Sequence, residues 1–309
     1  MLILNKRLGR RSNILFQFAS VIANAIEYDY KVINYNFQEF YRDHKGTERG
    51  KIPQADITVQ FLNNKFLTKV CRKILFSVSD LIKILFPKNY YKNYTGENQS
   101  LQLNSKSFLK KVKKSFFLID GWWYEDIESF VTHSSVLRKI FTPSDFVKEK
   151  LKEYFDLFSD NEYLVGVHIR WGDYRTWKNG KFNFSLETYR KYMEDLLKLN
   201  ELRNRKIRFL ICSDEEVHID ILKPLPCIKG PGSDIEDLYC LSQCSLILGP
   251  PSSFSAWASF YGDKPLYLIK NVNDKIRLED FKICAYYTPD KFHFFKNSIK
   301  DNIITRKYN

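Results

Sequence analysis

Short apolar runs alternate with amphipathic segments along the second half of the chain. Four apolar runs have the length of buried strands, namely residues 163–169, 207–212, 245–248 and 266–269. Three further segments have the apolar spacing of helices, namely residues 186–199, 235–243 and 254–261. Strands that alternate with helices in this way predict a parallel sheet with right-handed crossovers.

The start of the chain shows the same alternation once. An apolar strand over Leu2–Leu4 is followed by a polar loop over Gly9–Ser12. Asn13 is the expected N-cap of a helix that continues to about residue 25, and residues 31–35 form the next expected strand. These elements make one βαβ unit.

The middle of the chain is harder to interpret. Basic segments at residues 67–86 and 106–114 have helical spacing, but the strands between residues 36 and 120 are not evident. Pro143 and Ser144 precede an expected helix at 145–157. Because 309 residues can form two hydrophobic cores, we expect two α/β domains, residues 1–145 and 146–309.

Composition and charge narrow the possible partners. The chain is 44% hydrophobic and 16% aromatic, which argues against long disordered regions. Its formal net charge of +13 would attract phosphates on nucleotides, nucleic acids or anionic membranes, without choosing among them. The six cysteines include no C-x-x-C pair, so reduced thiols in a cytoplasmic protein are expected. Neither a signal peptide nor a membrane-spanning segment is expected.

Polar side chains follow three of the predicted strands. They are His168, Arg170 and Asp173 after the first strand, Asp214 after the second, and the Pro250–Ser255 segment after the third. Ligands bind beyond the carboxyl ends of strands in open α/β sheets, so these three clusters predict one crevice. Arg170 is the expected partner of an anion, because a guanidinium can donate two parallel hydrogen bonds to a phosphate.

Each of these residues also has a purely structural interpretation. His168 could be a core histidine, and Asp173 could orient Arg170 rather than react. Ser252, Ser253 and Ser255 could cap a helix or bind an anion at its N-terminus, while Phe254 could flank a base or lie in the core. Asp237 in a first helical turn complements the helix dipole, although its carboxylate could instead bind guanine. Asp214 could likewise have a capping role or contact a ribose.

The loop before the first helix carries Arg10 and Arg11. Its sequence is neither G-x-G-x-x-G nor a phosphate loop with a lysine, so dinucleotide and P-loop sites are excluded. The two arginines could face a diphosphate or remain solvated.

Three segments together resemble the fucosyltransferase superfamily, and most closely the α-1,2-fucosyltransferases of glycosyltransferase family eleven. Residues 168–174, HIRWGDY, resemble the family's H-x-R-R-G-D-Y, and residues 9–19, GRRSNILFQFA, resemble G-G-L-G-N-Q-x-F-Q-Y-A. Residues 237–258 resemble the closing motif, which peptide O-fucosyltransferases share.

The resemblance implies a GT-B fold, in which two Rossmann-like domains face across a cleft. It implies an N-terminal acceptor-side domain, a C-terminal domain that binds GDP-fucose, an inverting transfer, and neither cofactor nor metal. It places Arg170 on the β-phosphate, and His168 and Asp237 on the guanosine half. The remaining implied donor contacts are Asn13, Ser252, Ser253 and Phe254.

Two departures from the family pattern bear on this expectation. Trp171 stands where the family has a second arginine, which Arg10 or Arg11 could replace. Ser12 and Ile14 flank Asn13 in place of a glycine and a glutamine. These changes leave the linkage and the donor sugar open, so another GDP-sugar or a peptide acceptor is an alternative.

The expected reaction transfers L-fucose to a glycan hydroxyl, in α-1,2 linkage, in surface polysaccharide synthesis. Asp173 is the first candidate for the base that deprotonates the acceptor, and Glu125 and Asp126 are weaker candidates. Trp122, Trp123 and Tyr124 could stack on a sugar. The glycan could be lipid-linked, with the basic 67–86 helix at the inner face of the membrane, although packing of that helix on its own domain is the simpler expectation.

Two non-catalytic functions remain as alternatives, a sugar-nucleotide-binding protein and a basic nucleic-acid-binding protein. No nucleic-acid-binding motif supports the second, so no nucleic-acid partner is expected. A kinase is excluded because neither a glycine-rich loop nor D-F-G accompanies the His-Arg pattern.

Overall fold

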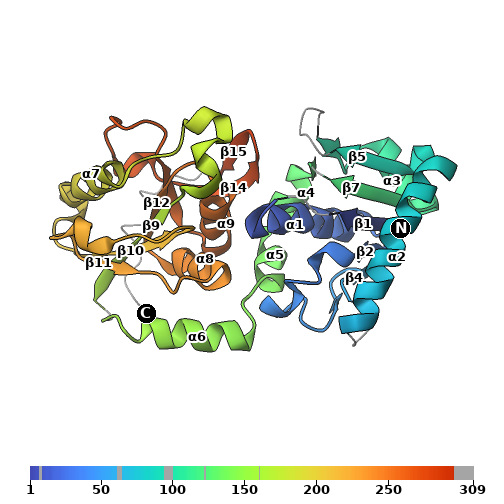
Figure 1. Ribbon diagram of the computed structural model, residues 1–309, viewed down its shortest axis with the longest axis horizontal. Helices are drawn as coiled ribbons and strands as arrows, with labels where there is room; N and C mark the ends of the chain where they lie inside the picture. The colour runs from blue at the N-terminus through green and yellow to red at the C-terminus, as the bar shows by residue number, and fades with distance from the viewer. Residues whose placement is uncertain (7–8, 61–64, 94–99, 122, 160, 296–309) are drawn as a thin grey trace. The chain divides into compact units, whose positions relative to one another are not determined.

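The computed structural model describes residues 1–309 except 7–8, 61–64, 94–99, 122, 160 and 296–309. The chain divides into two compact units, Met1–Phe146 and Val147–Asn309. The boundary lies one residue after the one expected from the sequence, within helix α6 (Asp145–Phe155). Each unit contains its own sheet with helices on both faces (Figure 1).

Unit 1 contains a six-stranded sheet in the order β3-β4-β2-β1-β7-β5, in which only β3 is antiparallel to its neighbour. Its strands are β1 (Leu2–Lys6), β2 (Val32–Asn34), β3 (Lys51–Ile52), β4 (Ile57–Thr58), β5 (Tyr90–Asn93) and β7 (Phe117–Gly121); β6 (Leu101–Gln102) and β8 (Tyr124–Glu125) pair separately. The helices α1 (Arg11–Tyr28), α4 (Ile127–Thr132) and α5 (Ser134–Ile140) lie on one face, and α2 (Lys65–Leu85) and α3 (Lys106–Lys114) on the other (Figure 1).

Unit 2 contains a seven-stranded sheet in the order β11-β10-β9-β12-β13-β14-β15. Its strands are β9 (Glu162–Ile169), β10 (Lys206–Ser213), β11 (Cys227–Lys229), β12 (Leu246–Gly249), β13 (Pro265–Leu268), β14 (Lys282–Thr288) and β15 (Lys291–Phe294). Helix α7 (Leu186–Leu197) covers one face, and α8 (Asp234–Gln243) and α9 (Ser253–Gly262) cover the other (Figure 1).

The four strands predicted in this unit are all observed, with ends that differ by one residue. The three predicted helices are also observed, with ends that differ by two residues or fewer. The expectation of a purely parallel sheet is wrong at one edge, because β14 and β15 are added in antiparallel fashion. Two consecutive strands joined by a short turn need no crossover helix, and this edge therefore lacks the βαβ pattern.

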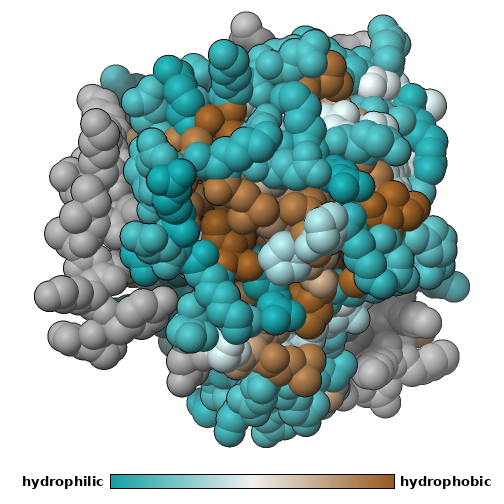
Figure 2. Space-filling model, turned by 90° about the vertical axis from the view of Figure 1, so that its left-hand side faces the viewer, coloured by the Kyte–Doolittle hydropathy of each residue, from teal (hydrophilic) through white to brown (hydrophobic). Residues whose placement is uncertain are grey.

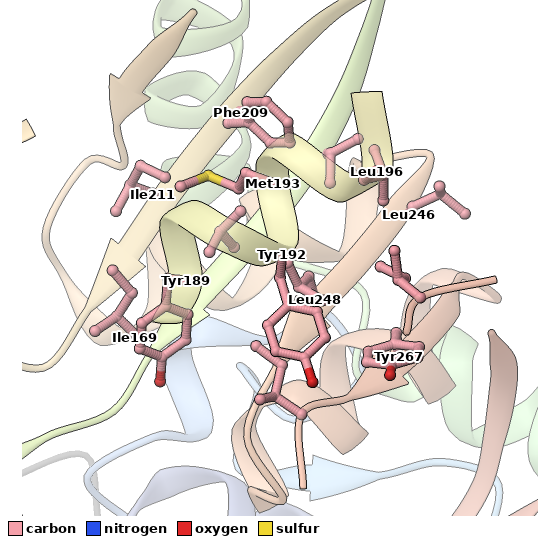
Figure 3. Packing of buried hydrophobic residues seen from close by; sticks show 14 of the residues in the cluster. Ile169, Tyr189, Tyr192, Met193, Leu196, Phe209, Ile211, Leu246, Leu248 and Tyr267 are labelled. Carbon is pink, nitrogen blue, oxygen red and sulfur yellow. The ribbon is translucent and has the colours of Figure 1, made fainter. Parts of the chain in front are cut away.

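The core of unit 2 forms where α7 lies across the parallel strands. Tyr189, Tyr192, Met193 and Leu196 lie on the inward face of α7 and are fully buried. They pack against apolar side chains of β9, β10, β12 and β13 (Figure 3). Fully burying one such side chain stabilises the fold by about 1.5–3 kcal/mol, so this contact fixes the strands whose ends carry the polar clusters.

The side of unit 2 that carries α7 and β11 faces the viewer in Figure 2. Apolar residues gather in the middle of this face and are framed by hydrophilic ones (Figure 2). Leu197 at the end of α7 and Ile221 are large apolar residues of this unit that are exposed. Arg190 Nη1 donates a hydrogen bond to the carbonyl of Ile221 at 3.2 Å, so α7 and the 219–222 turn lie together.

Candidate functional site

The three predicted polar clusters meet at one edge of the unit 2 sheet. Strand β9 lies between β10 and β12, with His168 opposite Cys212 and Val167 opposite Leu248. All three strands are parallel, so their carboxyl ends reach the same edge. The convergence predicted from the sequence is therefore present within unit 2.

Arg170 directly follows β9 and is nearly buried, with 11% of its side chain exposed. Its guanidinium contacts two carboxylates, with Nη2 2.7 Å from Asp173 Oδ1 and Nη1 3.3 Å from Asp214 Oδ2. The guanidinium carbon also lies 5.6 Å from the centre of the Tyr174 ring. Its Nε is buried and has no hydrogen-bond acceptor in the described part of the chain. Arg170 is thus held in place and retains one unused donor.

The two carboxylates around Arg170 differ in exposure. The Asp214 side chain is 12% exposed and also accepts a hydrogen bond from the backbone N–H of Trp171 at 2.9 Å. The Asp173 side chain is 52% exposed and lies in a 3₁₀ turn over Gly172–Arg175. Asp173 therefore orients Arg170, as one interpretation of the sequence held, while the contact of Asp214 with Arg170 was missed. No sequence signal reveals this contact, because it depends on the register of β9 with β10, which only the structure provides.

His168 links β9 to the start of α9. Its Nδ1 is hydrogen-bonded to Ser255 Oγ at 2.7 Å, and its ring centre lies 4.9 Å from that of Phe254. Burial, and then the nearby charge of Arg170, lower the pKa of His168 to about 3, so the imidazole is neutral near pH 7. A Cβ at Gly249 would lie 3.1 Å from Ser255 Oγ and 3.0 Å from the His168 carbonyl, so a larger residue there would require these neighbours to shift by a few tenths of an ångström.

The N-terminus of α9 lies beside His168. Ser252 is the N-cap, and its Oγ accepts a hydrogen bond from the N–H of Phe254 at 3.2 Å. The Tyr174 hydroxyl donates to the carbonyl of Pro251, which ties the turn after Arg170 to this helix start. Capping is therefore observed for Ser252, while the dipole of the helix still favours an anion at this end.

Asp237 lies in α8 and is 5% exposed. Its Oδ1 accepts a hydrogen bond from the backbone N–H of Gly232 at 2.9 Å. A Cβ at Gly230 would lie 2.7 Å from the same oxygen, so the 230–233 turn packs closely on the carboxyl group. Burial raises the pKa of Asp237 to about 6. Asp237 therefore lies in the first turn of α8 and also holds the 230–233 turn through the Gly232 N–H.

Trp171, which replaces an arginine of the family motif, belongs to the core. Its indole Nε1 donates to the carbonyl of Phe184 at 2.7 Å, and its ring packs against the α7 core. The side chain therefore supplies no positive charge to the site.

The predicted residues of unit 1 lie around the start of α1. The helix begins at Arg11 with Arg10 as its N-cap, so the expectation that Asn13 is the N-cap is wrong. The helix therefore starts three residues earlier than expected, directly after a turn at Gly9, which has a φ of 86°. The Oδ1 of Asn13 and the Oγ of Ser12 are buried and have no hydrogen-bond partner in the described residues.

Arg11 is held within unit 1. Its Nη1 lies 2.5 Å from Asp43 Oδ2, and its guanidinium carbon lies 4.4 Å from the centre of the Phe40 ring. Asp43 also lines a cavity of about 590 Å³ in this unit. The other residues that line the cavity are Arg42, Glu48, Arg49, Ser144, Asp145 and Phe146. All the residues that line this cavity belong to unit 1.

The weaker candidates for a base have structural roles. Asp126 is the N-cap of α4 and accepts hydrogen bonds from Ser129 and from Asn24, and Glu125 accepts one from the indole of Trp123. Trp123 and Tyr124 are buried, so the expected sugar platform is not formed by them, and Trp122 lies outside the described residues. Both carboxylates are buried and accept hydrogen bonds from neighbouring residues, so they serve the fold of unit 1. Their sequence positions did not reveal these partners.

Other chemistry is limited in the described part of the chain. No three His, Cys, Asp or Glu side chains are grouped there so as to hold a metal ion. The described cysteines, at positions 212, 227, 240, 244 and 284, form no disulfide.

Comparison with known proteins identifies the sequence family of the chain and solved structures with a similar fold. The sequence model of glycosyl transferase family 11 matches residues 58–290. An alpha-1,2-colitosyltransferase of Escherichia coli is 26% identical over 262 residues, which cover 82% of this chain and 84% of that protein.

Solved structures with a similar fold share 12–13% of the sequence. They are Arabidopsis thaliana FUT1 in complex with GDP (13% identity, TM-score 0.58, 88% of this chain and 71% of that chain), POFUT1 in complex with GDP-fucose (12%, 0.55, 85% and 94%) and NodZ alpha-1,6-fucosyltransferase soaked with GDP-fucose (13%, 0.52, 86% and 94%). These neighbours are GT-B fucosyltransferases, and the predicted GT-B type of α/β fold is confirmed.

Proposed function

Because this chain belongs to glycosyl transferase family 11 and is a fucosyltransferase-like glycosyltransferase, we propose that it transfers L-fucose from GDP-fucose to a glycan hydroxyl. The proposed transfer inverts the anomeric centre, forms an α-1,2 linkage, needs no metal and serves surface polysaccharide synthesis. The observation that carries this proposal is the nearly buried Arg170 beside the N-terminus of α9.

Arg170 is the proposed partner of the β-phosphate. As the bond between the anomeric carbon and the phosphate oxygen breaks, GDP gains negative charge. Arg170 supplies a fixed positive charge and a buried Nε donor, and the first turn of α9 adds backbone N–H groups. Donors that are already in place when charge develops lower the barrier most, because little reorganisation is needed.

Asp173 is the proposed base. It is the more exposed of the two carboxylates on Arg170, so an incoming phosphate can displace it with the smaller loss of buried structure. The displaced carboxylate would remain beside the reacting centre and could accept the proton of the acceptor hydroxyl. Asp214 then keeps Arg170 in position, which we propose in place of the expected ribose contact.

The guanosine half is assigned to Asp237 and the 252–255 segment. A guanine base offers two adjacent N–H donors, and a buried carboxylate with a raised pKa gains from both. Phe254 stacks beside the neutral His168 and offers an apolar surface for the nucleoside. Ser253 and Ser255 would contact the diphosphate.

Unit 1 is the proposed acceptor side. Asn13 would approach the diphosphate and sugar with its unused Oδ1, and Arg10 would add positive charge. The proposed acceptor is a glycan, with a lipid-linked form favoured, and the proposed location is the cytoplasm with a peripheral contact at the inner face of the membrane.

A second candidate donor is GDP-colitose. The relative from Escherichia coli is named as an alpha-1,2-colitosyltransferase, and it is similar over most of both chains. The same site would serve either sugar, since the diphosphate and guanine contacts are unchanged.

Donor hydrolysis tests the proposal directly. GDP-fucose, GDP-colitose, GDP-mannose and UDP-sugars are incubated with the protein, and GDP or UDP release is measured with and without a metal chelator. We expect release from GDP-fucose to be fastest and insensitive to the chelator, and to be lost in Arg170→Ala. Faster release from GDP-colitose would make GDP-colitose the donor in place of GDP-fucose. Faster release from a UDP-sugar would contradict the assignment of Asp237 to guanine.

Thermal unfolding separates the non-catalytic alternatives. Stabilisation by GDP but not by ADP or single-stranded DNA is the expected result. Stabilisation by DNA alone would favour a nucleic-acid-binding protein. GDP stabilisation without release from any donor would leave a sugar-nucleotide-binding protein.

A further inference from the structure

The outward face of α2 is apolar. Nine side chains of this helix are exposed among those that the structure describes, and two of them, Lys73 and Ser77, are polar. The other seven are large and apolar, with exposed fractions between 37 and 77%, namely Leu67, Val70, Ile74, Val78, Leu81, Ile84 and Leu85. We call Val70, Ile74, Val78, Leu81 and Leu85 the α2 apolar row, because their spacing places them on one stripe of a helix.

Helix α7 of unit 2 provides a comparison for the outward face of a helix that lies on a sheet. Its outward side carries ion pairs four residues apart, Arg190 with Glu194 at 2.9 Å and Lys191 with Asp195 at 3.4 Å. Both helices lie on a sheet, yet the α2 apolar row occupies the place where such pairs are expected. A continuous exposed apolar row of this length marks a surface that meets a non-aqueous partner.

Positive charge is concentrated in the segment that carries this row. Residues 65–114 contain twelve Lys and Arg against two Asp and Glu, so they contribute +10 of the net charge of +13. Among the lysines described as exposed are Lys73, Lys88, Lys106, Lys110, Lys113 and Lys114. An anionic surface is therefore the complement of this region.

The lysines of α3 lie close to one end of the row. The ring centres of Phe86 and Phe116, which follow α2 and α3, are 5.4 Å apart. Asn89 Nδ2 also donates a hydrogen bond to the carbonyl of Phe116 at 2.8 Å. The end of α2 at Leu85 and the end of α3 at Lys113 and Lys114 are thus fixed side by side in unit 1.

We propose that α2 lies flat on an anionic lipid bilayer, with the α2 apolar row inserted between the headgroups and the neighbouring lysines on their phosphates. An interfacial helix needs an apolar face and basic flanks, and α2 has both. No described helix is long and apolar enough to cross a membrane, which fits a helix lying on the surface. This surface belongs to unit 1 and does not depend on the donor assigned to unit 2.

Charge and chemistry favour a bilayer over two other occupants. A second copy of the chain would bring another +10 segment against the first, and the repulsion would oppose pairing. A nucleic acid would satisfy the lysines, but its phosphate backbone offers nothing to the exposed Ile74, Leu81 and Leu85.

Vesicle co-sedimentation of the full chain tests the proposal. We expect binding to vesicles of phosphatidylcholine mixed with phosphatidylglycerol, weaker binding at high salt, and little binding to phosphatidylcholine alone. The triple variant Ile74→Ser, Leu81→Ser and Leu85→Ser should bind the mixed vesicles at least about tenfold more weakly, because it removes most of the apolar surface available for insertion.

The matched control removes three exposed apolar side chains from unit 2, in Leu157→Ser, Leu197→Ser and Ile221→Ser. Its binding should equal that of the wild type, and both variants should keep the wild-type circular dichroism melting curve. Absence of wild-type binding at low salt, or equal binding by the α2 variant, would overturn the proposal. A wild-type dimer that becomes a monomer in the α2 variant would assign the row to a second copy. None of these results depends on sugar transfer.

Discussion

Arg11 of unit 1 and Arg170 of unit 2 are alike in exposure, in ion pairing and in contact with an aromatic ring. Each side chain is 11% exposed, each contacts a carboxylate, and each lies over an aromatic ring. They differ in what remains unused. Arg11 lies between Asp43 and Phe40 of its own unit, whereas Arg170 has a buried Nε without an acceptor in the described residues and a half-exposed partner in Asp173.

Burial and pairing are the same for both arginines, so these two properties alone cannot distinguish a structural arginine from one that is able to bind a ligand. An ion pair with a mostly buried partner stabilises a fold, and removing either member leaves a charge behind. An arginine can exchange its carboxylate for a phosphate more easily when that carboxylate is exposed. The exchange is also easier when the arginine keeps an N–H donor that no protein acceptor uses. We propose that Arg170 belongs to the second class and Arg11 to the first.

The largest expected effect is on turnover. Arg170→Ala should lower kcat/KM for GDP-fucose by about 10³, because the charge that offsets the leaving GDP is lost. Arg11→Ala should lower it by less than about tenfold, since its charge is used within unit 1. Steady-state GDP release measures both. Equal losses in the two variants would remove the distinction between the arginines.

The next effect concerns the exposed partner of Arg170. Asp173→Asn should lower kcat by about 10², through loss of the base, while GDP binds as well or better because it no longer displaces a carboxylate. Asp214→Asn is the comparison, and it should weaken GDP binding, because Arg170 loses its fixed neighbour. A near-normal kcat in Asp173→Asn would show that Asp173 is not the base and only orients Arg170.

The pH dependence of GDP binding gives a smaller effect. Below about pH 6 Asp237 becomes protonated and loses its ability to accept from guanine, so GDP affinity should fall about tenfold per pH unit there. Calorimetric titration from pH 7 to pH 5 measures this change, and Asp237→Asn should show only the smaller change that titration of the GDP phosphate itself causes. A wild-type affinity that stays constant over that range would contradict the guanine contact.

The same carboxyl group affects stability with a defined sign. Its folded-state pKa of about 6 lies above the unfolded value of about 4. Its favourable contribution is therefore complete below about pH 4 and is lost as the pH rises through 6, at a cost of about 2–3 kcal/mol at pH 7. Asp237→Asn should raise the free energy of unfolding at pH 7, and urea unfolding of both proteins measures the difference.

The smallest effect is on the stability of unit 1. Arg11→Ala should lower the free energy of unfolding by about 1–2 kcal/mol, because it removes an ion pair and a cation–π contact that are both largely shielded from water. Urea unfolding measures the loss. Unchanged stability together with a collapse of GDP affinity would instead make Arg11 a ligand contact.

The sequence was sufficient to predict the elements of unit 2 wherever local pattern decides structure. Val165–Ile169 is apolar and ends at polar residues, so the position of Arg170 at a strand end followed directly. Pairing of Arg170 with Asp214 could not be predicted, because the two are 44 positions apart and meet only through the register of β9 with β10. The start of α1 was misplaced because a positive φ at Gly9 outweighed the capping preference of Asn13.

The middle of unit 1 shows a second limit. Strands β3, β4, β6 and β8 are two residues long, too short for an alternating pattern to be visible. Glu125 and Asp126 were candidates for a base because carboxylates are common in active sites, and only their neighbours Trp123, Asn24 and Ser129 reveal hydrogen-bonded structural roles. Burial of charge, as at Asp237, likewise depends on the tertiary packing of the 230–233 turn.

The most direct measurement compares the affinities of GDP and guanosine in the wild type, Arg170→Ala and Arg11→Ala by calorimetry. Guanosine lacks the phosphates, so the ratio of the two affinities isolates the contact with the diphosphate. The ratio should fall at least about tenfold in Arg170→Ala and remain unchanged in Arg11→Ala. An unchanged ratio in Arg170→Ala would contradict the assignment of that guanidinium to the β-phosphate.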